Sequence, residues 1–134
     1  MAVQLSVAAR NAMLDELELL IGPDPILKIR TGSAPANCAT ADSGTVLATI
    51  VLSYNWMNDA SGGSKSKSSD TWQDASADAS GTALHFRLYE LTGTTCQMQG
   101  TVGVGTGDLQ VDNATFASGQ SFTITSFTLT AGNA

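Results

Sequence analysis

The sequence of 134 residues is long enough for one domain (residues 1–134) with a hydrophobic core of its own. It is 43% hydrophobic but only 13% charged, and its net charge of -6 excludes a protein that binds nucleic-acid phosphates through a basic stripe. Ala, Ser, Thr and Gly take the place of charge, which indicates either a surface that packs against neighbouring subunits or low sequence complexity.

The sequence shows no recognisable signal for export or membrane insertion. The first charged residue is Arg10, so no basic segment precedes an apolar run with a cleavage site. No apolar run approaches the roughly 18 residues that a membrane span needs. We therefore expect synthesis in the cytoplasm and no contact with a membrane.

A helix is predicted near the start of the chain, from Val3 to Ile21. Ser6 is a suitable N-cap, and Gly22 followed by two prolines ends the helix. Apolar residues at helical spacing predict the buried face: Met13, Leu14, Leu17, Leu20 and Ile21. The predicted solvent side carries Asn11, Asp15 and Glu18. The apolar face could cover its own sheet, which we favour, or enter a groove on another subunit.

Two strands follow, separated by an irregular loop. Residues 26–31 (ILKIRT) alternate, with Leu27 and Ile29 predicted on the buried side. Residues 32–44 keep no period and are rich in turn-forming residues, which predicts a loop. Residues 45–53 (TVLATIVLS) are apolar almost throughout, which predicts a strand covered on both faces.

A long loop is predicted over residues 60–80. Connections of this length are usually functional or disordered when they have no secondary structure. Trp72 in the middle of the segment predicts at least one anchored point.

A hairpin from Leu84 to Val102 is predicted at the centre of the domain. In its first strand apolar and polar residues alternate: Leu84, Phe86 and Leu88 against His85, Arg87 and Tyr89. We therefore expect one buried apolar side and one exposed polar side. The short link between the strands predicts antiparallel pairing.

The last strands are predicted at residues 108–112 and 120–130, after a glycine-rich turn at residues 103–107. In the final strand Phe122 and Ile124 keep one phase, whereas Phe127 and Leu129 keep the other. A bulge near Ser126, or a strand that crosses between two sheets, would bring both pairs to the core.

These elements predict a mainly β fold. We expect an antiparallel β-sandwich or jelly-roll-like barrel of about six to eight strands over residues 26–130, with an N-terminal α-helix over residues 3–21 packed along it.

Cys38 and Cys96 could form a disulfide. Two cysteines in a chain without an export signal are more often free thiols, and Cys96 lies on the apolar phase of its strand. We therefore favour free thiols and keep the disulfide as the alternative.

The residues favour a protein that is not an enzyme. The one histidine, His85, lies on the polar phase of a strand, and no G-x-S-x-G nucleophile elbow occurs. Residues 103–107 (GVGTG) lack the helix-opening context of a dinucleotide-binding loop, so no cofactor is expected.

Acidic residues cluster in two places: Asp70, Asp74 and Asp78 in the long loop, and Asp108 and Asp112 around a short strand. Carboxylate and carbonyl oxygens can bind calcium, but no EF-hand spacing is present. We favour solvated loop acids and expect no metal site.

Tyr54, Trp56 and Trp72 are candidate interaction residues. Their rings could form a stacking platform for a sugar. The alternative, which we favour, is that one or both tryptophans fill the core or an intersubunit pocket.

Four segments carry a resemblance that covers nearly the whole chain: MAVQLSVAARNAMLDELELLIG, LKIRTGSAPANCATADSGTVLATI, WMNDASGGSKSKSSDTWQDASADASGTALHFRLYE and SFTITSFTLTAGNA. Together they resemble a family of small proteins encoded in tailed bacteriophages and prophages, generally described as hypothetical or virion structural proteins. The resemblance implies a virion component made in the host cytoplasm and no enzyme. It transfers no role to any single residue.

Residues and resemblance together predict a non-enzymatic virion structural protein that decorates or cements the capsid. A neck, tail or fibre-adaptor subunit is the alternative within this class, and a carbohydrate-binding module for host attachment is the competing class. We expect a homo-oligomer, with a trimer favoured, that also contacts other virion proteins such as the major capsid protein. Loops 32–44 and 60–80, or an uncharged sheet edge at residues 120–130, would make these contacts.

Overall fold

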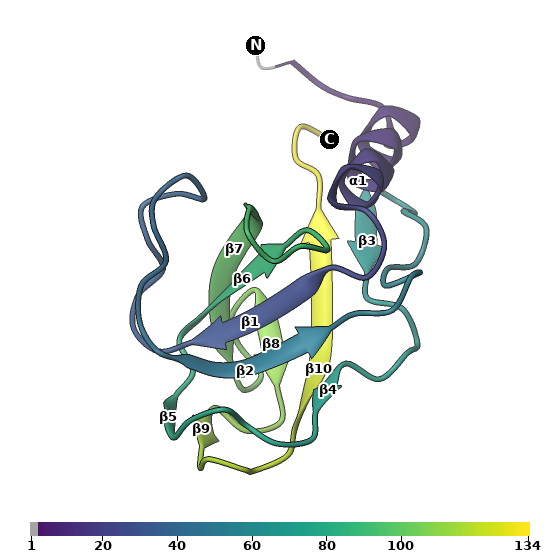
Figure 1. Ribbon diagram of the computed structural model, residues 1–134. Coiled ribbons are helices and arrows are strands. Elements are labelled where there is room, and N and C mark those ends of the chain that lie inside the picture. The colour runs from purple at the N-terminus through teal and green to yellow at the C-terminus, as the bar shows by residue number, and fades with distance from the viewer. Residues whose placement is uncertain (1–2) are drawn as a thin grey trace.

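The computed structural model describes residues 3–134, so the first two residues of the predicted domain lie outside the described part. One helix lies at the end of a strongly curled sheet, and both termini lie at that same end (Figure 1). The elements are α1 (Val7–Ile21), β1 (Ile26–Arg30), β2 (Val46–Val51), β3 (Ser64–Ser66), β4 (Gln73–Asp74), β5 (Gly81–Thr82), β6 (His85–Tyr89), β7 (Cys96–Gly103), β8 (Leu109–Val111), β9 (Thr115–Phe116) and β10 (Phe122–Thr130). The predicted mainly β fold with an N-terminal helix is confirmed.

The main sheet has the strand order β2-β1-β6-β7-β8-β10-β3, and β4 also pairs with β10. A small ribbon of β5 and β9 stands apart from it. The predicted hairpin is confirmed, because β6 and β7 pair antiparallel, with Phe86 opposite Gly100 and Leu88 opposite Met98. The sheet is mixed rather than wholly antiparallel, since β7 and β8 run parallel.

The parallel pair depends on the glycine-rich turn between its strands. Val102 pairs with Leu109 although only a short link joins them, whereas parallel strands normally need a crossover of a dozen or more residues. Gly105 and Gly107 have positive φ (69° and 87°), a conformation that other residues adopt only with strain. At Gly103 a Cβ would lie 2.6 Å from Thr106 Oγ1, so the turn is too tight for a side chain there.

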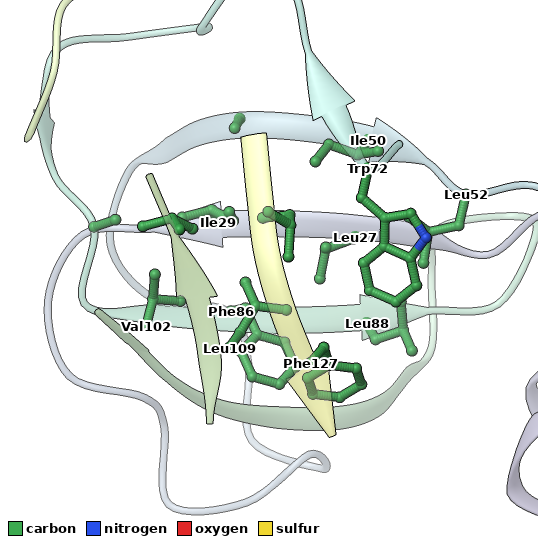
Figure 2. Packing of buried hydrophobic residues seen from close by; sticks show 14 of the residues in the cluster. Leu27, Ile29, Ile50, Leu52, Trp72, Phe86, Leu88, Val102, Leu109 and Phe127 are labelled. Atoms are coloured by element: carbon green, nitrogen blue, oxygen red, sulfur yellow. The ribbon is translucent and has the colours of Figure 1, made fainter. Parts of the chain in front are cut away.

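Curling of the sheet closes the core, because β10 passes over the face of β1 and β6. Phe127 on β10 packs edge-on against Phe86 on β6, with ring centroids 5.6 Å apart. Trp72 lies 6.0 Å from Phe127 and 6.3 Å from Trp56. Figure 2 shows Trp72 and Phe127 among the aliphatic side chains that β1, β2 and β6 contribute. Burial of this cluster is the main source of stability for the fold.

The last strand has the predicted bulge. Its register against β8 shifts between Ile124 and Ser126, and Phe122, Ile124 and Phe127 are all buried. However, β10 is not the open sheet edge that we expected, since β8 pairs with one side of it and β3 and β4 with the other.

Three other local predictions were wrong. The segment 60–80 is not a structureless loop, because it contains β3 and β4. The strand predicted at 45–53 is the edge strand β2, and the Val51 side chain is 64% exposed. Strand β6 is buried on both faces, including its polar residues, whereas Leu84 is exposed just before the strand begins.

Helix α1 begins at Val7 rather than at Val3. Ser6 is the predicted N-cap, since its hydroxyl accepts a hydrogen bond from the N–H of Ala9 at 3.1 Å. The helix packs beside β3 at one end of the molecule and not along the sheet (Figure 1). No helix within residues 3–134 is both long and apolar enough to cross a membrane.

Candidate interaction surface

The polar face of α1 attaches the helix to the rest of the protein. Asn11, Asp15 and Glu18 are spaced so that they share one helix face, and each accepts a hydrogen bond from a backbone N–H of residues 57–63. The bonds run from Gly63 N to Asn11 Oδ1 (2.8 Å), from Ala60 N to Asp15 Oδ1 (2.9 Å) and from Met57 N to Glu18 Oε2 (3.1 Å). We had predicted that this face points to solvent; it instead contacts residues 57–63, although the Asp15 side chain stays 47% exposed.

Lys65 on β3 completes the attachment. Its side chain is only 1% exposed, and its Nζ lies 2.7 Å from Asp15 Oδ1 and 3.0 Å from Glu18 Oε1. Burial disfavours the charged lysine, but the hydrogen bonds to the two carboxylates outweigh it and raise the pKa of Lys65. The hydrogen bond from Lys65, followed by that from the Ala60 N–H, lowers the pKa of Asp15. The interaction therefore keeps both partners charged at neutral pH.

The apolar side of α1 consequently points outward. Only Leu14 and Ile21 of the predicted buried face are buried, whereas Met13 is 55% and Leu20 66% exposed. Leu19, on another side of the helix, is 73% exposed. A shallow, mostly apolar groove of about 760 Å³ lies between this side of α1 and the end of β10, where Thr130 and Ala131 line it.

Because α1 is attached through polar residues, its exposed apolar residues are not required for its position in the fold. Exposed apolar residues that gather on one element typically mark a contact with another molecule. We call this set of Met13, Leu17 and Leu20, together with the groove beside them, the α1 outer face. The sequence held a signal for attachment of α1 by its polar face. Asn11, Asp15 and Glu18 share one helix face, and a lysine lies in a Ser- and Gly-rich segment later in the chain.

A second polar cluster holds the loop between β1 and β2 against the outer side of β6. Arg87, with a side chain 2% exposed, donates to Asp42 Oδ1 (2.5 Å) and to the carbonyl oxygens of Asn37 and Thr40 (2.9 Å each). Its Nε donates to Gln99 Oε1 at 3.0 Å. The guanidinium therefore binds the loop through backbone carbonyls that any loop sequence would offer, which is why alternation alone did not reveal the burial of Arg87.

Asp42 collects three donors in this cluster. It accepts from Arg87, from the hydroxyl of Tyr89 at 2.7 Å and from Arg30 at 3.1 Å. Burial opposes its charge, but the hydrogen bonds from Tyr89 and Arg87 outweigh burial and lower the pKa of Asp42. The carboxylate of Asp42 and the guanidinium of Arg87 bond to groups of the same chain, so we assign the cluster a structural role.

His85 is 1% exposed, and its Nδ1 lies 2.7 Å from the carbonyl oxygen of Gly32. Since a carbonyl oxygen can only accept, Nδ1 carries a proton. The ring is thus enclosed beneath the same loop, away from solvent and from the α1 outer face.

The five candidate metal-binding acids do not converge. Asp74 accepts from Thr49 N, Asp78 from the Thr49 hydroxyl and Asp70 from the Ser53 hydroxyl. Asp108 accepts from Thr101 and Asp112 from Thr123. Among residues 3–134 no group of three or more His, Cys, Asp and Glu side chains is placed to hold a metal ion. These carboxylates bind loops and turns to the sheet.

The three candidate aromatic residues separate into two groups. Trp56 and Trp72 are 1% and 2% exposed and belong to the core, as the favoured alternative predicted, and Trp56 Nε1 donates to Gly22 O at 3.1 Å. They cannot present their faces to an external sugar. Tyr54 is 76% exposed and borders a hollow of about 370 Å³ next to Leu19.

Searches of protein-family models, curated proteins and solved structures found no match for this chain. The resemblance to bacteriophage virion proteins therefore stays a prediction from the sequence.

Proposed function

We propose that this chain is a non-enzymatic structural subunit of a tailed-bacteriophage virion, and that the α1 outer face is its contact with the particle. Capsid decoration or cementing is the first assignment, and a neck, tail or fibre-adaptor position is the second. The observation that carries the proposal is the attachment of α1 by its polar residues, which leaves Met13 and Leu20 exposed. The scarcity of charge in the sequence supports it.

The partner on the α1 outer face is the major capsid protein rather than a second copy of this chain. Each copy has a net charge of -6, and Glu16 lines the groove beside Met13. Self-association through this face would bring the acidic residues of two helices together, and like charges across an interface are unfavourable. A coat surface with apolar side chains and a basic residue near Glu16 is complementary to it.

The helix cannot supply the whole interface. A helix of 15 residues is about 22 Å long and about 10 Å wide, so its footprint is about a quarter of the roughly 800 Å² per partner in a stable complex. Several copies bound together would compensate for a weak single contact. This agrees with the proposed homo-oligomer, a trimer, on the particle.

Quantitative mass spectrometry of purified particles tests the assignment. Hundreds of copies per particle indicate decoration, a dozen or fewer indicate a neck or tail position, and absence from the particle overturns the proposal. Leu20→Glu should reduce binding to particles that lack the protein by at least about tenfold. Val104→Glu is the matched control, because Val104 is similarly exposed (57%) in the turn between β7 and β8. Equal binding by both variants would contradict the role of the α1 outer face.

Tyr54 supports a second candidate function, a carbohydrate-binding module. An exposed ring beside a hollow that also contains Asn55 offers a stacking surface together with amide hydrogen-bonding groups. A glycan array probed with the protein and with Tyr54→Ala separates the two classes. Specific sugar binding that Tyr54→Ala abolishes would favour the attachment module over the structural subunit.

A further inference from the structure

The two cysteines of the sequence lie in one place in the fold. Cys38 is in the loop between β1 and β2, and Cys96 is the first residue of β7. Both are half-buried free thiols, and both line a hollow of about 370 Å³ together with Arg87 and Tyr89. Residues far apart in the sequence thus share one solvent-accessible hollow.

The surroundings of Cys96 make its thiol a weak acid, because burial first and the Cys38 thiol second raise the pKa of Cys96 to about 12. The Cys96 Sγ donates to the carbonyl oxygen of Met98 at 3.4 Å, so its side chain is held rather than free to turn outward.

The loop that carries Cys38 is fixed without any covalent bond. Arg87 binds the carbonyl oxygens of Asn37 and Thr40, the residues on either side of the segment that contains Cys38. Gln99 Nε2 donates to the carbonyl oxygen of Pro35 at 2.7 Å. The loop therefore cannot carry Cys38 away from Cys96 without losing several partly buried hydrogen bonds. Reaction between two groups held in this way is effectively intramolecular and fast.

We propose that Cys38 and Cys96 are a redox-active pair that forms an intramolecular disulfide on contact with a disulfide oxidant such as oxidised glutathione. The bond would fasten the β1–β2 loop to β7 covalently. The proposal rests on the geometry of the loop and the hollow, and it does not depend on the proposed virion function.

The chemistry proceeds by two thiol–disulfide exchanges. The Cys38 thiolate attacks one sulfur of oxidised glutathione, forms a mixed disulfide and releases one glutathione thiolate. Cys96 then loses its proton and attacks the Cys38 sulfur, which expels the second glutathione thiolate. In sum the two cysteines lose two electrons and two protons, and oxidised glutathione becomes two molecules of glutathione. Cys38 reacts first because the raised pKa of Cys96 makes it the poorer initial nucleophile.

The test treats the folded full chain with oxidised glutathione at mildly alkaline pH and maps the peptides by mass spectrometry without reduction. The expected product is a Cys38–Cys96 cross-linked peptide within a single copy of the chain, with no bound glutathione. Its melting temperature should exceed that of the reduced protein by roughly 10 °C. Dithiothreitol should reverse both changes.

Two serine variants provide the controls. Cys96→Ser removes the second step, so a stable glutathione adduct should accumulate on Cys38. Cys38→Ser should react at least about tenfold more slowly, because only Cys96 remains and its raised pKa leaves little thiolate. Three results with the wild-type chain would each overturn the proposal: glutathione bound to both cysteines, a disulfide between two copies, or two thiols that stay unreacted.

Discussion

Replacement of Lys65 by methionine tests whether α1 is attached to the body by charge. Methionine keeps an unbranched side chain of similar length but cannot donate to Asp15 or Glu18. The variant therefore loses two charge-assisted hydrogen bonds and leaves the two carboxylates of one helix face with only their backbone N–H donors.

The expected loss of stability is about 2–3 kcal/mol. Breaking a fully buried ion pair costs about 3–5 kcal/mol, because the remaining charge has no partner. Here Lys65 is buried, but the Asp15 side chain is 47% and the Glu18 side chain 20% exposed, so water solvates part of the abandoned charge. The cost therefore falls below that range.

Urea unfolding followed by far-UV circular dichroism measures the effect. With a slope of about 1.5–2 kcal/mol per molar urea, the midpoint should fall by about 1.5 M. The helical signal should fall first, since a helix of 15 residues is marginal in water without tertiary contacts.

Lys67→Met is the matched control for this experiment. Lys67 directly follows β3, but its ammonium contacts no carboxylate of α1: it donates to the carbonyl oxygens of Ser68 and Asp70 and lies 5.3 Å from the centre of the Trp72 ring. Its loss should cost about 1 kcal/mol or less. Equal midpoints for the two lysine variants would refute the argument that the carboxylates of α1 need Lys65.

Two further predictions concern the fold. Gly44→Ala should lower the free energy of unfolding by about 3 kcal/mol, because φ is +73° and a Cβ would overlap the Thr31 carbonyl oxygen. Gly119 has a similar φ but open space around it, so Gly119→Ala should cost about 1 kcal/mol. Thermal denaturation of both variants checks this, and equal losses would contradict it. Trp72→Ala should cost about 3–5 kcal/mol and Tyr54→Ala about 0.5 kcal/mol or less, as measured by denaturant titration. A tolerated Trp72→Ala would contradict its place in the core.

Much of the sheet could be predicted from sequence because alternation records which residues face the core. Leu27 and Ile29 on β1 are buried as predicted, and the phase change around Ser126 correctly indicated a bulge. These signals are local, since each depends only on the pleat of one strand.

Two of the failures, at β6 and at α1, share one physical cause, which is that a buried polar group depends on a partner distant in sequence. Arg87 is buried because a loop more than forty residues earlier offers it carbonyl oxygens, as the bond to Thr40 shows. The orientation predicted for α1 was wrong because Asp15 and Glu18 accept hydrogen bonds from donors in residues 57–65. Periodicity separates the apolar from the polar side of an element. It does not show whether the rest of the protein will supply hydrogen-bond partners that allow the polar side to be buried.

The attachment of α1 should also depend on pH, with opposite signs for its two charged partners. Asp15 has a lowered pKa, so the stability it contributes is present above its unfolded value of about 3.9 and is lost as pH falls through its folded pKa. Lys65 has a raised pKa, so its contribution is present below about 10.4 and is lost as pH rises through its folded value. Attachment is therefore constant between about pH 5 and 10 and weakens outside that range.

Amide hydrogen exchange at Ala60 measures the loss of attachment at low pH, because the Ala60 N–H donates to Asp15 Oδ1. Its protection, corrected for intrinsic exchange, should fall below about pH 4, while protection at Gly119, whose N–H binds a backbone carbonyl far from α1, should persist. Asp15→Asn keeps an oxygen that can accept from Ala60 but cannot titrate. In that variant the protection should be lower at neutral pH and nearly flat down to pH ~3. If Ala60 still lost protection over the same acid range, a group other than Asp15 would control the attachment, and the assignment of the Lys65–Asp15 pair as the pH-sensitive contact would be wrong.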